Sequence, residues 1–274
     1  MKWLYSVIVG AVLTSNWSAN AHDFWIESVD SDITRETSVS VIAKTGHGVD
    51  QSNWPLVPHR ITSLKSIGPA GIKDHQSAIK EAVRTGTIEF SGLTDGAHIL
   101  AIESGNSYSE LPADLFAAYV EEEGITPITR DRDTAEKKER TGKELYSRRG
   151  KTIVKTGKQR DANPHLTNPI GMTLEIVPIQ DPFGIAPGSP VEVQVLYQGH
   201  PVEEATIHVT KLDEPDISTT LLTGSGGIAE MPELLGGRWL FHTVWSSPAR
   251  GLLNDADYIT VFSSLTFDIS DAHE

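Results

Sequence analysis

Histidines close to the amino terminus carry the strongest chemical signal in this sequence. Residues 1–21 have the pattern of an export signal, with Lys2 ahead of an apolar stretch and Ala19-Asn20-Ala21 as the cleavage site. Cleavage after Ala21 leaves His22 as the first residue, whose α-amine and imidazole together offer a metal ion two nitrogen ligands. We therefore expect His22 to bind a transition-metal ion.

A second imidazole would complete a nitrogen-rich site, and three further histidines are candidates. His47 lies in a turn between two glycines, which let another segment approach closely, although a plain turn explains them equally well. His59 follows a proline-containing loop, and His242 shares a strand face with apolar neighbours, so ordinary packing is an alternative for both. Imidazole and amine ligands favour Ni(II), Co(II) or Cu(II) over Ca²⁺ and Mg²⁺.

Other chemistry-bearing residues have ordinary structural explanations. His98 and His208 alternate with apolar residues, which predicts plain strand positions, and Glu121-Glu122-Glu123 is typical of a solvated run at a helix end. The sequence contains no cysteine nucleophile, no His-Glu-x-x-His pair, no nucleophile elbow and no phosphate-binding glycine-rich loop. The protein is therefore more simply explained as a binding protein than as an enzyme.

Composition and charge restrict the cellular compartment in which the protein is expected and the classes of partner that it can bind. The formal net charge is −14, from 23 basic and 37 acidic residues, which argues against a nucleic-acid partner because phosphate binding needs a clustered basic face. The chain has no cysteine, so its stability must come from core burial rather than disulfides. With an export signal and no second long apolar run, we expect a periplasmic protein without a membrane span in its mature form.

The elements that must position these residues are mostly strands. Short β-rich runs separated by glycine and proline turns predict a mainly β fold, with two immunoglobulin- or transthyretin-like sandwich modules at residues 22–104 and 151–274. Between them, residues 105–150 are expected to form a helical insertion, with one helix over 111–124. The mixed charges of residues 130–149 predict a second, solvent-exposed helix anchored by Tyr146, or alternatively a docking surface.

An ordered series of motifs resembles a known family. They are Ala21-His-Asp-Phe-Trp-Ile-Glu27, Gly46-His-Gly48, Leu100-Ala-Ile-Glu-Ser104, Phe116-Ala-Ala-Tyr-Val-Glu-Glu-Glu-Gly124, Tyr146-Ser-Arg-Arg149, Leu174-Glu-Ile-Val-Pro178 with Asp181-Pro182, Gly237-Arg-Trp-Leu240 and Ser264-Leu-Thr-Phe267. The series resembles the periplasmic Domain of Unknown Function 4198 family, often labelled a nickel- or cobalt-uptake component. The resemblance implies transition-metal handling linked to a membrane importer. It places His22 and His47 at family positions, while Trp245, with His242 nearby, stands where members tend to carry another histidine.

Three functional hypotheses follow from these observations. The first is a periplasmic binding protein for a divalent transition metal, nickel or cobalt, that assists uptake. The second is an envelope interaction module without a metal, built from the sandwiches and the charged insertion. The third is a copper-dependent oxidase in which His22 and another histidine brace the copper ion.

Overall fold

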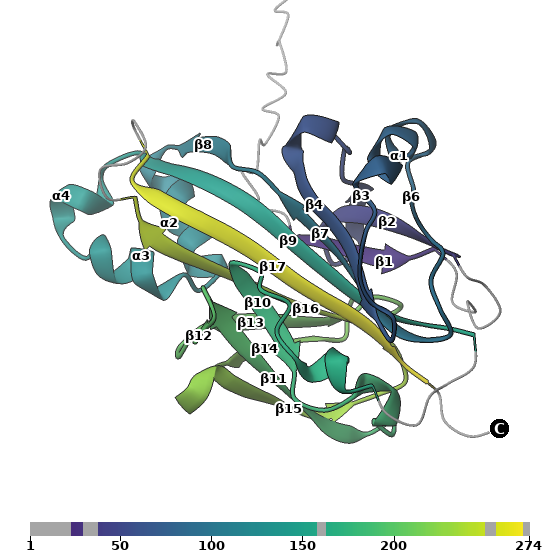
Figure 1. Cartoon of the computed structure of the whole chain (residues 1–274). Helices are drawn as coiled ribbons and strands as arrows, with labels where there is room; N and C mark the ends of the chain where they lie inside the picture. Colours follow the sequence, from purple (N-terminus) through teal and green to yellow (C-terminus); the bar gives the residue numbers. More distant parts are fainter. Residues whose placement is uncertain (1–22, 30–37, 158–162, 250–255, 271–274) are drawn as a thin grey trace, which may run out of the picture.

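A nine-stranded mixed sheet runs through the computed structural model, which describes residues 23–29, 38–157, 163–249 and 256–270 (Figure 1). Its strand order is β14 (Ser218–Leu222), β13 (Thr206–Lys211), β16 (Gly237–Pro248), β17 (Tyr258–Ile269), β9 (Gly142–Thr156), β7 (Gly96–Ser104), β4 (Ile61–Gly68) and β5 (Gly71–Asp74), and β8 (Ser107–Leu111) also pairs with β9. β17 and β9 run parallel, whereas the other neighbouring strands in this sheet pair in antiparallel fashion. We call it the central sheet.

Two smaller sheets of four strands each pack on opposite faces of the central sheet. The first, the β1 sheet, contains β1 (Asp23–Ser28), β2 (Ser38–His47), β3 (Asp50–Asn53) and β6 (Ile88–Ser91). The second, the β10 sheet, contains β10 (Leu174–Pro178), β11 (Ser189–Tyr197), β12 (His200–Pro201) and β15 (Ile228–Leu234). Neighbouring residues of β7 show the arrangement, because Leu100 packs into the core beneath the β1 sheet and Ile99 into the core beneath the β10 sheet.

The mainly β fold with sandwich-like packing is confirmed. Val191, Val193 and Val195 of β11 are fully buried and alternate with partly exposed residues, as the sequence pattern predicts for a strand with one buried face. The central sheet takes strands from both sides of the predicted helical insertion, so one sheet is common to both predicted modules. The module boundaries at residues 104 and 150 stay predictions.

Helices cover part of the central sheet and form parts of the connections between its strands. The α-helices are α1 (Ile79–Thr85), α2 (Ala113–Glu122), α3 (Thr126–Asp131) and α4 (Ala135–Lys138), and short 3₁₀ helices span Pro58–Arg60 (η1), Gln76–Ala78 (η2), Pro164–Thr167 (η3), Pro182–Gly184 (η4) and Ser225–Gly227 (η5). The predicted helix over 111–124 is confirmed as α2, whose Phe116, Tyr119 and Val120 pack against Phe262 and Tyr258 of β17. Among the described residues, none of the helices has the length and apolar character needed to cross a membrane.

The charged segment 130–149 differs from the helix expected for it. Only the end of α3 and the short α4 are helical, and from Gly142 onward the chain forms β9, between β17 and β7. Tyr146 therefore lies in a strand, where its ring meets that of Phe262 edge-on at 6.1 Å. Backbone pairing on both sides outweighs helical charge pairs, each of which contributes only about 0.2–0.5 kcal/mol.

Candidate metal centre

Two carboxylates and one imidazole form a buried cluster on one face of the central sheet. Asp23 begins β1, Glu123 follows the last residue of α2, and His242 lies in β16. One ligand atom from each lies within 4.8 Å of the other two. Nδ1 of His242 is 2.9 Å from Oδ1 of Asp23 and 3.8 Å from Oε2 of Glu123. His242 is 0 % exposed, so its imidazole lies inside the protein. We call Asp23, Glu123 and His242 the inner cluster.

Close backbone approaches bring β1 and α2 onto this face. Thr266 of β17 donates a hydrogen bond of 2.7 Å to the carbonyl oxygen of Ile26, which fixes β1 against the central sheet. Gly150 in β9 leaves room for β1, since a Cβ at this position would lie 3.0 Å from Phe24. Gly124, with φ +62°, ends α2 directly over β13, where a Cβ would lie 2.1 Å from Oγ1 of Thr206. These contacts place Asp23 and Glu123 beside β16.

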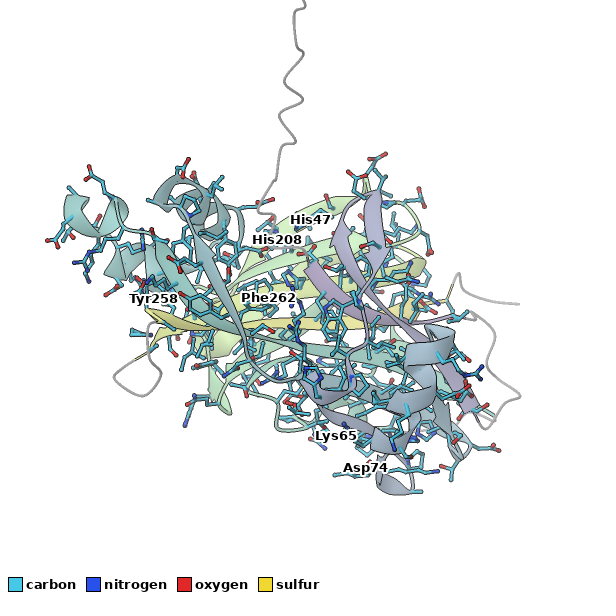
Figure 2. The ribbon with its side chains drawn as sticks, turned by 90° about the horizontal axis from the view of Figure 1, so that it is seen from above. His47, Lys65, Asp74, His208, Tyr258 and Phe262 are labelled. Atoms are coloured by element: carbon cyan, nitrogen blue, oxygen red, sulfur yellow. The ribbon has the colours of Figure 1, made fainter. Side chains whose placement is uncertain are left out.

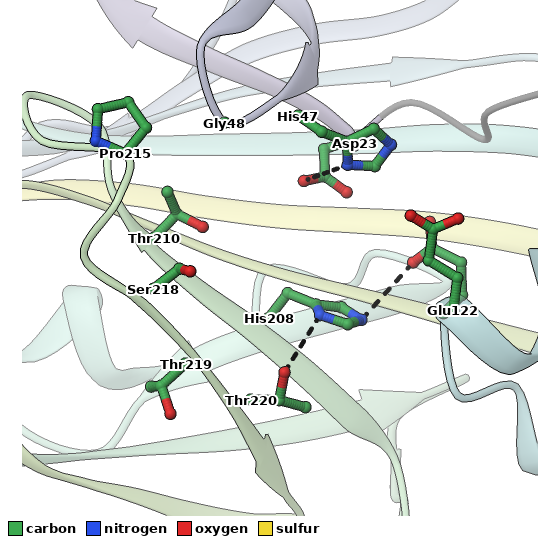
Figure 3. A pocket seen from close by; sticks show the side chains of 11 residues that line it. Asp23, His47, Gly48, Glu122, His208, Thr210, Pro215, Ser218, Thr219 and Thr220 are labelled. Atoms are coloured by element: carbon green, nitrogen blue, oxygen red, sulfur yellow. Dashed lines mark hydrogen bonds and ion pairs between the residues drawn. The ribbon is translucent and has the colours of Figure 1, made fainter. Parts of the chain in front are cut away.

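Two more histidines stand at the rim of the inner cluster, one from each side (Figures 2 and 3). His47, near the end of β2, places its Nδ1 3.4 Å from Oδ2 of Asp23. His208 of β13 is the cross-strand neighbour of His242, and its Nε2 is 3.9 Å from Oε2 of Glu123. We call His47 and His208 the outer pair.

A pocket of about 320 Å³ opens onto the outer pair. Its lining comprises Asp23, His47, Gly48, Glu122, Glu123, His208, Thr210, Pro215, Ser218, Thr219 and Thr220. Hydroxyl groups of β13 and β14 form one wall, opposite Asp23 and His47 (Figure 3). His242 is not part of the lining, because it lies beneath the two carboxylates. The pocket thus leads from solvent to the outer pair and then to the inner cluster.

Burial and mutual charge shift the ionisation of these groups. Burial raises the pKa of Glu123 to about 7, although the neighbouring His242 opposes the shift. Burial also favours a protonated Asp23, but His242 and His47 outweigh it and hold the pKa of Asp23 well below its usual range. For His242, burial alone would lower the pKa, yet Asp23 and then Glu123 raise it above the ordinary value. Asp23 therefore stays ionised beside a His242 whose protonated form is favoured, and Glu123 gains or loses its proton near neutral pH.

Several polar side-chain atoms of this site lack hydrogen-bond partners among the described residues. They are Oε2 of Glu123, both ring nitrogens of His242 and Nε2 of His208, and all four are buried, although Nδ1 of His242 lies 2.9 Å from Oδ1 of Asp23. Buried polar atoms are normally paired, and each exception calls for an explanation such as an ion. Imidazole with carboxylate is a donor set that suits first-row transition metals. The residues present therefore fit such an ion.

The structure brings two of the predicted ligands together and separates a third. His47 and His242 both contact Asp23, through different carboxylate oxygens. His59 is exposed in η1 and is not among the residues that line the pocket. His22, the residue before Asp23, lies outside the described residues.

Sequence reasoning missed the other members of the site. His208 lines the pocket instead of occupying a plain strand position, and Glu123 is only 2 % exposed, whereas a solvated run was expected. Asp23 had no signal beyond its place after His22. Gly124 predicts only the end of the helix, and the close packing on Thr206 that buries Glu123 becomes visible only in the structure.

Comparisons with known proteins extend over most of the chain. A family model described as "Domain of unknown function (DUF4198)" matches residues 19–247. No curated protein matches the chain. Among solved structures, a tetra-tandem repeat from the extending region of a large adhesion protein is 11% identical, with a TM-score of 0.20, and the match covers 91% of this chain and 50% of that one. The chain therefore spans half the length of that structure.

Two further solved structures are similar at the same low level. The fibronectin(III)-like modules of CbhA from Clostridium thermocellum are 9% identical, with a TM-score of 0.21 and coverage of 91% of this chain and 98% of that chain. Three amino-terminal domains of the outer capsid protein Hoc of bacteriophage RB49 are 9% identical, with a TM-score of 0.17 and coverage of 90% and 59%. These likenesses do not bear on the inner cluster.

Proposed function

The chain belongs to the DUF4198 family, and we propose that it is a binding protein for a divalent transition-metal ion, nickel or cobalt, held by the inner cluster. The observation that carries the proposal is that buried polar atoms of Glu123 and His242 converge next to Asp23 without a hydrogen-bond partner in the part of the chain that the structure describes. A protein interior rarely keeps such atoms together unless something binds them.

Charge balance supports a divalent ion in this position. Two ionised carboxylates, from Asp23 and Glu123, neutralise a charge of +2, and the ion in turn compensates two acids that are costly to bury. Binding displaces protons from the ligands, because metal coordinates the deprotonated carboxylate and the neutral imidazole. The nitrogen of His242 directs the preference toward transition metals and away from Ca²⁺ and Mg²⁺.

We further propose that the protein acts in the periplasm and delivers the ion to a membrane importer. The support is the export-signal pattern of residues 1–21 and the acidic composition, which attracts cations. Cleavage after Ala21 would also place the α-amine of His22 one residue from Asp23, and that amine is then an additional ligand.

Calorimetric titration of the exported protein tests the proposal. After removal of metal by a chelator, we expect Ni²⁺ and Co²⁺ to saturate at one ion per chain, with Mg²⁺ and Ca²⁺ at least about 100-fold weaker because the cluster contains imidazole. A form extended at its amino terminus by a few residues serves as the comparison. Equal affinity in both forms removes the α-amine of His22 from the site, and absence of any nickel or cobalt binding contradicts the proposed function.

A further inference from the structure

We propose that the outer pair, His47 and His208, provides transient positions, each with its neighbouring carboxylate, at which the metal ion binds first, before it passes to the inner cluster. The inference rests on the proposed function and adds the path by which the ion enters the inner cluster. It concerns how the ion reaches His242, which is fully buried and is not part of the pocket lining.

Both carboxylates face an inner and an outer histidine. Asp23 directs Oδ1 to Nδ1 of His242 at 2.9 Å and Oδ2 to Nδ1 of His47 at 3.4 Å. Oε2 of Glu123 is almost equally distant from His242 and His208, at 3.8 and 3.9 Å. An ion bound by His47 with Asp23, or by His208 with Glu123, would therefore already touch a carboxylate that holds it in the inner cluster. It can move inward by exchanging one imidazole for another.

His208 has the features of a metal ligand that the inner cluster does not use. Its Nε2 is buried, has no hydrogen-bond partner among the described residues, and lies 3.9 Å from Oε2 of Glu123. Its Nδ1 is 3.5 Å from Oγ1 of Thr220, the cross-strand neighbour on β14. When Nδ1 donates to this hydroxyl, Nε2 is left with its lone pair, which is the form of imidazole that binds metals.

The number of acidic groups at the site favours one ion that uses the outer and inner positions in succession over two ions bound at the same time. One divalent ion neutralises Asp23 and Glu123, and Glu122 is the remaining acid among the residues that line the pocket. A second divalent ion would carry uncompensated charge in a partly buried site, which is unfavourable.

Stepwise arrival also lowers the cost of dehydration. Complete desolvation of a divalent ion is strongly unfavourable, and imidazoles at the edge of the cluster replace some of its waters before the ion reaches the buried nitrogen. The side chains of His47 and His208 are 32% and 28% exposed and line the pocket, although Nε2 of His208 itself is buried and becomes accessible only when the ring rotates. Loss of the outer pair should therefore slow binding and release alike.

Stopped-flow measurements of Co²⁺ binding test the inference, with a H47A/H208A double variant against the wild type. We expect the association and dissociation rate constants both to fall at least about tenfold, equal to roughly 1.4 kcal/mol in the barrier, while Kd changes less than about threefold. The matched control is H59A/H200A, which removes two exposed histidines outside the pocket and should alter neither rate. A H47Q/H208Q variant, expected to behave in the same way, is used if the alanine form lacks the wild-type circular dichroism.

Each other outcome overturns the inference. A weaker Kd with an unchanged association rate would make the outer pair permanent ligands, and two bound ions per wild-type chain would make the positions simultaneous. Association and dissociation rate constants that are unchanged in the H47A/H208A and H47Q/H208Q variants would show that the outer pair is not on the route. These results leave the proposed function intact, whereas a wild-type chain that binds no cobalt or nickel contradicts the proposed function itself.

Discussion

Replacement of His242 by alanine is expected to weaken Ni²⁺ binding by at least about 100-fold, because loss even of groups that only orient metal ligands costs 10–100-fold. His242 supplies the only nitrogen among the three side chains of the inner cluster. Without it, the side chains of the inner cluster offer only the carboxylate oxygens of Asp23 and Glu123, which have little preference for nickel. Competition with a chromogenic chelator measures the affinity.

A second buried histidine of the central sheet provides the control for this variant. His98 lies in β7, is 3% exposed, and has its Nε2 2.7 Å from the carbonyl oxygen of Thr94. H98A should reduce the free energy of unfolding, since it removes a packed and hydrogen-bonded side chain, and leave nickel affinity within about threefold of wild type. If H242A and H98A bind nickel equally well, His242 is not a ligand.

The second large effect is expected from alanine at Gly124. The new Cβ would lie 2.1 Å from Oγ1 and 2.8 Å from Cβ of Thr206, and φ is +62°. Thr206 is β-branched and held in β13, so the end of α2 must move away and carry Glu123 out of the inner cluster. We expect nickel affinity to fall at least about tenfold and the free energy of unfolding to fall by about 2 kcal/mol or more.

Alanine at Gly86 is the control that separates the effect of the steric clash from the effect of backbone strain. Gly86 ends α1 in the same left-handed conformation, with φ +81°, but has no atom within 4 Å of the position of a new Cβ. G86A should therefore lose about 1 kcal/mol of stability and retain full nickel affinity. Equal nickel affinity in G124A and G86A would show that the close packing of α2 on β13 does not position Glu123 for metal binding.

Features encoded by local spacing could be predicted from the sequence. The alternation of Val191, Val193 and Val195 identifies a strand, and the spacing of Phe116, Tyr119 and Val120 identifies α2, because each pattern needs only one buried face. His47 is predicted for a similarly local reason, since its flanking glycines mark a tight turn, in which Gly46 closely approaches the backbone of Asp50.

The rest of the site depends on pairing between distant segments. His208 meets His242 only because β13 and β16 pair in one register, and a shift by one residue would turn His208 to the other face. Glu123 is buried only because α2 ends over β13. The charged residues of β9 were expected in a helix, since their local pairs favour one, and they form a strand because β17 and β7 flank them. No pattern within either segment contains this information.

Anomalous diffraction at the nickel absorption edge, from crystals of the nickel-loaded protein, tests the central claim most directly. The account predicts one peak between Asp23, Glu123 and His242, about 2 Å from Nδ1 of His242, as is usual for imidazole bound to a first-row ion such as zinc. A peak bound by other residues, or no peak from protein saturated with nickel, would contradict it.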